Sequence, residues 1–209
     1  LGDVYKRQIK KDVIKDLRAK MTEDMTPVDN RPLGHEPWLP NGPYALKVPT
    51  KARVWMSGMM LGVAQAAIDE TIEFGKARSM TLGGKPRGSM PGNQFAVADA
   101  AMFIEAGRAL LIQEVRKITV KAMNGEEFMP EDAARVEMAG LVARENAQKA
   151  VDRLFAVRGA HGLYETDTFE RYYRDVRMGT LHAVSAPDLV REQLGKHLLD
   201  IPLDVEPRW

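Results

Sequence analysis

The amino-acid sequence predicts an all-α protein, an up-and-down four-helix bundle preceded by an irregular, proline-rich segment. Two observations support this prediction. From residue 50 onwards, apolar residues recur at the three- and four-residue spacing of amphipathic helices, and no alternating strand pattern of any length appears. Glycine and proline divide this region into three helical stretches of roughly 25–32 residues and a shorter fourth, and long helices joined by short loops pack as antiparallel neighbours.

The region before residue 50 is predicted to lie outside the bundle. Its first eight residues, LGDVYKRQ (1–8), resemble a translated sequencing-adapter remnant and are excluded from the fold prediction. Residues 9–20 fit either a short amphipathic helix or the last strand of a preceding domain. Residues 21–49 contain six prolines, which forbid a regular helix or an interior strand. We therefore expect residues 9–49 to be the end of another domain with its connector, and the chain to be a C-terminal fragment.

Four helices are expected in the domain formed by residues 50–209. The first begins at Thr50, a good N-cap, and runs to about Arg78, where the glycine-rich residues 81–92 follow. The third begins at Pro130, a favourable first-turn residue, and runs to about residue 157, and the last covers about 187–199. The second runs from about residue 92 to 123, and the face expected to enter the core comprises Phe95, Ala98, Met102, Ala106, Ala109 and Ile112.

Residues 157–183 connect the third helix to the last one and concentrate unusual residues. Gly159 and Gly162 interrupt the helical pattern and allow the backbone to approach another group closely. Three arginines between residues 171 and 177 form a cluster of the kind that binds phosphate or carboxylate. His182 lies at the end of the stretch, and histidine is the residue type most often used as a switchable proton donor or acceptor. The alternative interpretation is a helix–loop–helix corner with a solvated, charged face.

Composition excludes several classes of function. With 30 Lys and Arg against 29 Asp and Glu, the net charge is +1, so neither a nucleic-acid nor an anionic-membrane surface is expected. No apolar run approaches the ~20 residues that span a bilayer. The absence of cysteine excludes zinc–thiolate sites and thiol catalysis, and fits a cytoplasmic protein. No metal site is expected, because none of the four histidines follows a glutamate by three residues.

The helix surfaces predict self-association. Helices of about 40–48 Å, at 1.5 Å per residue, are longer than a small monomer needs. Their alanine, glycine and methionine surfaces are apolar on more than one side. We therefore expect the bundle to pack against copies of itself as a homo-oligomer.

Three motifs in order resemble the C-terminal bundle of the acyl-CoA dehydrogenase superfamily. They are GVAQAAIDETIEFGKARSM (62–80), NQFAVADA at the start of the second helix, and RGAHGLYETDTFERYYRDVRMGTLHA (158–183). The resemblance covers about residues 50–200. It is greatest to the two-component, reduced-flavin-dependent monooxygenases, which include hydroxylases of p-hydroxyphenylacetate and steroid catechols.

The resemblance implies a fold, a cofactor and partners. The family has an N-terminal helical domain, a middle β-domain and this bundle, usually as a homotetramer, so residues 9–49 would be the end of the β-domain and its connector. The flavin, reduced FMN or FAD supplied by a separate flavin reductase, lies between the β-domain and the bundle. The implied reaction is hydroxylation of a small, aromatic substrate by O₂ through a C4a-hydroperoxyflavin.

The resemblance also implies cofactor-binding residues. Arg78 matches an arginine that reaches the flavin phosphate of a neighbouring subunit, although an arginine at a helix C-terminus is also favoured by the helix dipole. Gln94 matches a glutamine near the flavin, or is an ordinary polar residue at a helix start. The segment Gly159–Gly162 matches a glycine-rich turn near a neighbour's cofactor, but Ala160 and His161 depart from the usual pattern. The Arg174–Asp175 pair matches the family's RD pair, and we expect it to be an ion pair that fixes the corner.

Two alanines stand where dehydrogenases carry their catalytic base. The base is a glutamate eight residues after the aspartate of the RD pair, or, in a minority, near the start of the first bundle helix. These positions hold Ala183 and Ala52, which cannot accept a proton. In the monooxygenases an arginine and a histidine at about these places face the flavin ring, and Arg53 and His182 match them as catalytic residues. A helix-cap or core role is the alternative for His182.

Three functional hypotheses follow. The first is a flavin-dependent monooxygenase. The second is an acyl-CoA dehydrogenase-like flavoenzyme with a displaced base. The third is a non-catalytic, helical oligomerisation module, inactive alone because the flavin-ring-binding domain is absent from this chain.

Overall fold

The computed structural model describes residues 48–79, 84–182 and 186–202. The predictions for residues 1–47, including the adapter remnant and the connector, lie outside the described residues. In the described part there is no strand, and a single antiparallel bridge joins Ser79 to Pro86. The all-α prediction is confirmed.

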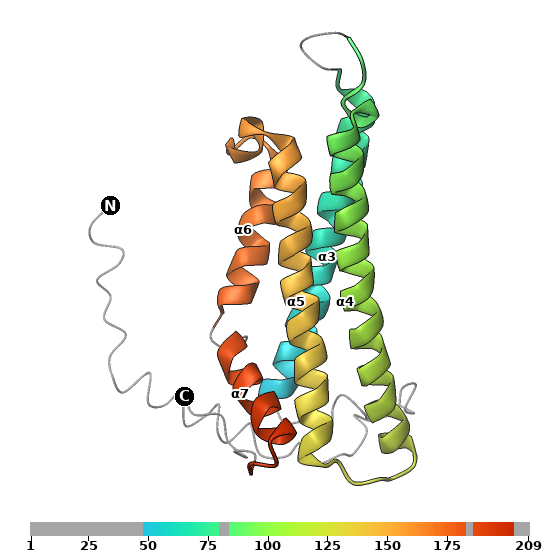
Figure 1. Cartoon of the computed structure of the whole chain (residues 1–209), viewed down its shortest axis with the longest axis vertical. Coiled ribbons are helices and arrows are strands. Elements are labelled where there is room, and N and C mark those ends of the chain that lie inside the picture. Colours follow the sequence, from blue (N-terminus) through green and yellow to red (C-terminus); the bar gives the residue numbers. More distant parts are fainter. Residues whose placement is uncertain (1–47, 80–83, 183–185, 203–209) are drawn as a thin grey trace, which may run out of the picture.

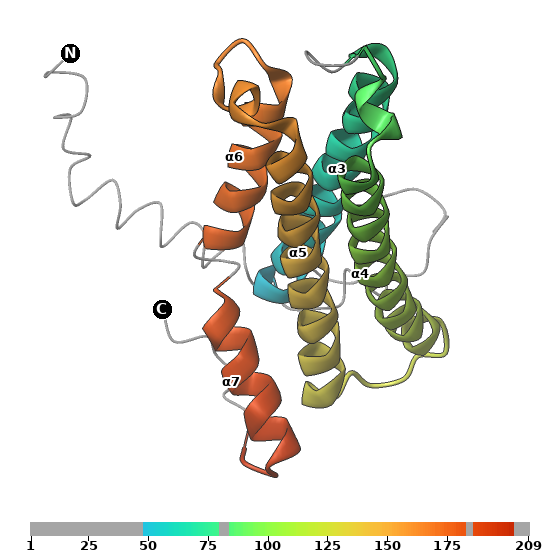
Figure 2. The same cartoon turned by 45° about the horizontal axis from the view of Figure 1, so that its top comes forward.

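Five α-helices and two short 3₁₀ turns make up the described chain. The long helices are α3 (Val48–Ala77), α4 (Pro91–Met123) and α5 (Pro130–Arg158). The shorter ones are α6 (Thr168–Leu181) and α7 (Pro187–Leu198). The 3₁₀ turns are η1 (Arg87–Ser89) and η2 (Ala160–Leu163). The three long helices lie side by side, with α6 antiparallel to α5 and α7 beyond it (Figures 1 and 2).

Local sequence explains where these helices begin and end. Pro91, Pro130 and Pro187 each occupy the first turn of a helix, where a missing N–H costs no hydrogen bond. Gly159 ends α5 with φ of 77°, a left-handed conformation that glycine adopts without steric cost. Asp167 caps α6, because its carboxylate accepts a hydrogen bond of 2.9 Å from the Phe169 N–H.

The fourth helix of the bundle differs from the predicted one. The expected helix near 187–199 exists as α7, but it packs mainly on α5, whereas α6 packs against both α3 and α5. The bundle therefore consists of α3, α4, α5 and α6, and α6 lies inside the stretch expected to be a corner. Five of its fourteen residues are charged, and only one narrow stripe, which includes Phe169 and Val176, is buried.

The predicted core face of α4 is wrong. Phe95, Met102 and Ile112 are exposed, and Ala98, Ala106 and Ala109 lie on the same exposed side. The buried face carries Ala96, Ala100, Ile104, Gly107, Leu111, Glu114 and Ile118. Both sides of α4 are apolar, so periodicity alone could not choose between them. Small residues decide the choice: a Cβ added at Gly107 would lie 3.0 Å from the Ala143 Cα, so α4 and α5 approach closely there.

No helix in the described residues is long and apolar enough to cross a membrane.

Candidate functional site

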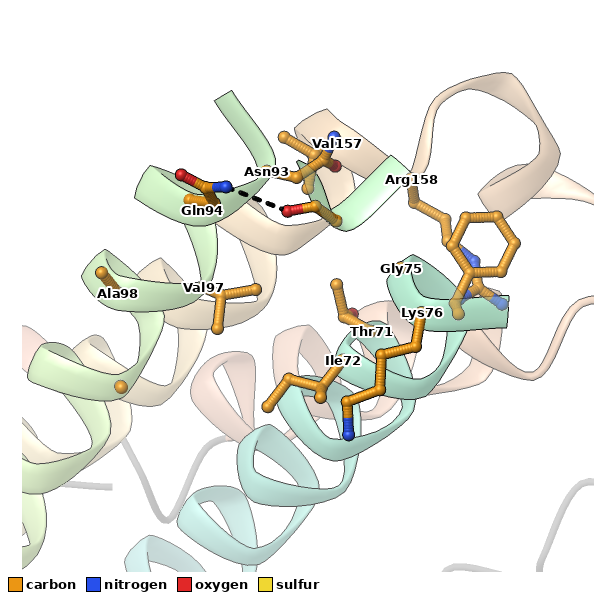
Figure 3. Close-up of a pocket in the computed structure, with 13 residues that line it drawn as sticks. Thr71, Ile72, Gly75, Lys76, Asn93, Gln94, Val97, Ala98, Val157 and Arg158 are labelled. Atoms are coloured by element: carbon orange, nitrogen blue, oxygen red, sulfur yellow. Dashed lines mark hydrogen bonds between the residues drawn. The ribbon is translucent and has the colours of Figure 1, made fainter. Parts of the chain in front are cut away.

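Two neighbouring cavities lie at the end of the bundle where α3 and α5 finish and α4 begins. One is polar, with a volume of about 430 Å³. The other is apolar, with a volume of about 420 Å³ (Figure 3). Phe74 and Arg158 line both cavities. The polar cavity, which we call the arginine chamber, is lined by Phe74, Arg78, Ser79, Arg87, Arg158, Tyr164, Thr166, Asp167 and Thr168.

Three guanidinium groups of the arginine chamber gather around the Phe74 ring. The guanidinium carbons lie 4.0 Å (Arg158), 5.3 Å (Arg87) and 5.8 Å (Arg78) from the ring centroid. Cations within about 6 Å of an aromatic face are attracted by its quadrupole. Phe74 therefore helps to hold together three positive charges that would otherwise repel one another.

Arg158 is the structural centre of the chamber. Its Nη2 atom lies 2.8 Å from Glu70 and 2.8 Å from Asp167, so it ties α3 to the segment before α6. Only 6% of its surface is exposed. Among the described residues, Arg158 Nη1 and Arg87 Nε are buried without a hydrogen-bond partner. Buried donors without partners are costly, so these two N–H groups favour an acceptor such as a phosphate oxygen.

The structure brings four of the predicted cofactor-binding residues to this end of the bundle. Arg78 lines the arginine chamber, and Gln94 lines the apolar cavity, where its Nε2 donates to the Gly88 carbonyl at 3.2 Å (Figure 3). Gly159 ends α5 beside the chamber. Gly162 packs on Arg158, since a Cβ added there would lie 2.9 Å from the Arg158 Cγ. The side chain of His161 lies outside what the structure describes.

Sequence reasoning found Arg78 but missed the other two arginines of the chamber, and it misjudged the RD pair. Arg87 and Arg158 carried no sequence signal beyond their charge. Arg174 pairs with Glu170 at 3.4 Å, and Asp175 pairs with Arg171 at 3.5 Å, so the predicted Arg174–Asp175 ion pair does not form. Neighbouring residues on a helix point about 100° apart, which explains the difference. Arg158 fixes the corner instead.

Arg53 lies in the interior of the bundle. It is 1% exposed and forms an ion pair with Glu137 of α5. Arg144, also 1% exposed, donates from Nη1 to the Arg53 carbonyl at 3.2 Å and to Ser57 Oγ at 2.8 Å. Burial and the neighbouring Arg53 lower the pKa of Arg144 to about 10, against the opposing effect of Glu137. This buried cluster holds two cations and one anion between α3 and α5.

His182 lies at the C-terminal end of α6, away from the arginine chamber. Its side chain is exposed, and its backbone N–H donates a hydrogen bond to the Met178 carbonyl at 3.0 Å. Gly179 contacts Met60, because an added Cβ would meet the Met60 side chain. His182 lies three residues after Gly179, and Arg53 lies seven residues before Met60. Because α6 and α3 are antiparallel (Figure 1), both steps run in the same direction along the bundle, so the axial positions of His182 and Arg53 differ by only about 6 Å, at 1.5 Å per residue. The two predicted catalytic residues thus share one level, His182 on the surface and Arg53 in the core.

Exposed apolar side chains lie near this level. Trp55 and Met59 of α3 and Met178 and Leu181 of α6 are all more than half exposed.

The described residues contain no cluster of side chains that could hold a metal ion.

Known proteins resemble this chain in sequence and in fold. It is 30% identical over 151 residues to a 3-sulfinopropanoyl-CoA desulfinase of Cupriavidus necator, covering 72% of this chain and 35% of the relative. It is 26% identical over 160 residues to the oxygenase subunit HsaA of a flavin-dependent monooxygenase of Mycobacterium tuberculosis, covering 77% and 40%. The crystal structure of 3-HSA hydroxylase from Rhodococcus superposes with a TM-score of 0.69 at 24% identity, covering 77% and 42%.

The chain spans only about 35–42% of the length of these proteins. Residues 54–187 match the family description "Acyl-CoA dehydrogenase, C-terminal domain", which is well over half of the chain. The chain therefore belongs to the acyl-CoA dehydrogenase family and carries its C-terminal helical domain.

Proposed function

We propose that this chain is the C-terminal part of a flavin-dependent monooxygenase, which uses reduced flavin and O₂ to hydroxylate a small aromatic substrate. One observation carries the choice of chemistry: Ala52 and Ala183 occupy the two positions where a dehydrogenase would place its glutamate base. An alanine cannot abstract the proton that α,β-dehydrogenation removes.

Glu137, the carboxylate beside Arg53, does not replace the missing base. Glu137 is buried and ion-paired to Arg53, so its charge is already compensated inside the core. His182 is exposed at the end of α6 and can hydrogen-bond or exchange a proton with a bound group. We assign His182 as the catalytic residue. Arg53 is a positioning residue, because its guanidinium lies in the core and holds the start of α3 against α5.

The arginine chamber fits the phosphate end of a flavin. Phosphate oxygens can accept hydrogen bonds from its arginines and from the hydroxyls of Ser79, Thr166 and Thr168. Two of its buried N–H groups have no partner among the described residues. Phosphate is common to FMN and FAD, so the proposed cofactor is either of these flavins. When bound, the reduced flavin supplies the electrons that activate O₂.

The remaining partners follow from this chemistry. A separate flavin reductase supplies the reduced cofactor, and the enzyme works as a homo-oligomer, a tetramer in the proposed form. The arginine chamber of one copy then receives the flavin phosphate of another, while Gln94, Gly159 and the His161 turn line the approach.

Replacing Arg78 by alanine is expected to weaken flavin binding by about 10- to 100-fold, the loss that follows when a hydrogen bond to a charged group is removed. The measurement is flavin fluorescence titration of the full-length polypeptide. Arg171→Ala, which removes an exposed arginine outside the chamber, serves as the control and should leave binding unchanged. Equal affinities for both variants would exclude Arg78 from the flavin site.

A second candidate function is catalysis on an acyl-CoA thioester, favoured by the 30% identity to the desulfinase. An anaerobic titration of the full-length polypeptide, loaded with oxidised flavin, separates the two. In a monooxygenase of this kind, the bound flavin stays oxidised when acyl-CoA thioesters are added. Reduced nicotinamide reduces this flavin only through a separate reductase. Bleaching of the flavin by an acyl-CoA would overturn the proposal.

A further inference from the structure

The η1 turn lies between the two cavities of the candidate site. Arg87 lines the arginine chamber, whereas the next residue, Gly88, lines the apolar cavity. The turn packs against both α3 and α4. The position of this short turn therefore decides where the Arg87 guanidinium lies relative to the other groups of the chamber.

Arg87 carries a charge that the chamber can offer to an anion. Arg158 is already paired with two carboxylates. The Arg87 side chain is held by weaker contacts: its Nη2 donates to the Val157 carbonyl at 3.3 Å, and its guanidinium carbon lies 5.3 Å from the Phe74 ring centroid. Neither contact neutralises the guanidinium, so its charge, together with the buried Nε donor, is available to a bound phosphate.

Two glycines allow η1 to approach α3 backbone to backbone. A Cβ added at Gly88 would lie 3.1 Å from the Gly75 carbonyl oxygen and 3.3 Å from the Gly75 carbonyl carbon. Carbon atoms in normal van der Waals contact are about 3.5–4.0 Å apart, so a side chain at Gly88 would push η1 away from α3. The φ angle of Gly88 is not positive, so close approach, and not a left-handed turn, requires glycine at this position.

Hydrogen bonds to both neighbouring helices hold the backbone of η1. The Arg87 N–H donates to the Arg78 carbonyl, directly after α3, at 2.8 Å. The Arg87 carbonyl accepts a hydrogen bond of 2.8 Å from Asn93 Nδ2 at the start of α4. Gln94 Nε2 donates to the Gly88 carbonyl, as the dashed line in Figure 3 shows. The main chain is thus fixed on both sides of the Arg87 Cα, and the side chain extends from a fixed point.

We propose that Gly88 and Asn93 are positioning residues, which set the affinity of the arginine chamber for a phosphate group by holding Arg87 in place. Neither residue lines the chamber, so both act on the bound group only through Arg87. A hydrogen bond weakens steeply as its distance and angle depart from the optimum, and the rigid guanidinium fork has little freedom to compensate. This inference rests on the proposed role of the chamber as a phosphate site.

The first test measures the binding of inorganic phosphate to the 209-residue chain by phosphorus NMR titration at constant ionic strength. Gly88→Ala and Asn93→Ala are each expected to weaken binding by about 3- to 10-fold, because each displaces the Arg87 donors. Gly92→Ala controls for the first variant, since a Cβ added at Gly92 meets nothing within 4 Å. Asn124→Ala controls for the second, since this asparagine bonds Glu126 at the other end of α4. Both controls should bind phosphate as the unmodified chain does.

A comparison of double variants distinguishes the positioning of Arg87 from a general loss of stability. In the Arg87→Ala background, Gly88→Ala and Asn93→Ala should no longer change the affinity for phosphate, because the group through which they act is gone. A loss of stability would persist in that background. Circular dichroism confirms that each variant is folded at the temperature of the titration. Asn93→Gln keeps the amide donor, and the apolar cavity that Asn93 lines has room for the extra methylene, so this variant should recover part of the affinity.

The outcomes separate this inference from the flavin proposal. Unchanged phosphate affinity in folded Gly88→Ala and Asn93→Ala, or equal losses with and without Arg87, would overturn the positioning role. Absence of phosphate binding by the unmodified chain would overturn it as well. A parallel titration of the full-length polypeptide with FMN tests the cofactor: the expected pattern with phosphate, combined with no binding of FMN, would support the positioning role and contradict the flavin site.

Discussion

Replacing Glu137 by alanine is expected to lower the free energy of unfolding by about 3–5 kcal/mol, as when one partner of a buried ion pair is removed. Glu137 is the anion of the buried cluster, and its removal leaves Arg53 and Arg144 as neighbouring cations in the core. Single domains are stable by only about 5–15 kcal/mol, so the variant should be close to unfolding. Urea denaturation followed by circular dichroism measures the change.

Two variants control this experiment. Glu145→Ala removes a carboxylate of the same helix that pairs with Arg191 at the surface, and should cost less than about 1 kcal/mol. The double variant Arg53→Met with Glu137→Leu replaces the pair by apolar groups and should recover most of the stability. If Glu137→Ala costs no more than Glu145→Ala, the buried cluster does not stabilise the contact between α3 and α5.

Replacing Arg158 by alanine is expected to lower the free energy of unfolding by about 2–4 kcal/mol. The variant loses the contacts to Glu70 and Asp167 and the packing on Phe74. Asp167 also caps α6, so the segment between α5 and α6 should become more sensitive to proteolysis. Urea denaturation and limited proteolysis together measure both effects.

The comparison variants for Arg158 separate charge from geometry. Arg158→Lys keeps the positive charge. A lysine ammonium lacks the planar, forked guanidinium that contacts both Glu70 and Asp167, so this variant should recover only part of the stability. Arg174→Ala removes an exposed arginine of α6 with a single ion pair at 3.4 Å, and should change stability by less than about 1 kcal/mol. Equal effects of Arg158→Ala and Arg174→Ala would contradict the central position given to Arg158.

The long helices could be predicted from sequence because their signals are local. The glycine-rich residues 81–92 before α4, and Pro130 in the first turn of α5, placed the starts of these helices to within a few residues. The buried side of α4 could not be predicted, because Phe95 and Met102 outweigh Ala96 and Ala100 in hydrophobicity. The face with small residues is buried because α5 approaches α4 closely there. This close approach depends on both helices, so it cannot be read from the sequence of α4 alone.

The candidate site was predictable only where a residue type is itself unusual. Gly159 stood out by interrupting a helix, and Arg78 by its place in a motif. Arg158 is one of many arginines, and its importance arises from Glu70, Phe74 and Asp167, which come together only in the folded chain. The burial of Arg53 was likewise hidden, because its partner Glu137 lies 84 residues away.

The most direct test of the proposed monooxygenase follows the oxygen atom. The full-length polypeptide, supplied with reduced flavin and a panel of small phenols, is exposed to O₂ labelled with oxygen-18, and the products are analysed by mass spectrometry. The proposal predicts a hydroxylated product that carries one labelled oxygen atom, and a large loss of that product in His182→Ala with flavin binding retained. Absence of label from every product, together with reduction of the bound flavin by an acyl-CoA, would contradict it.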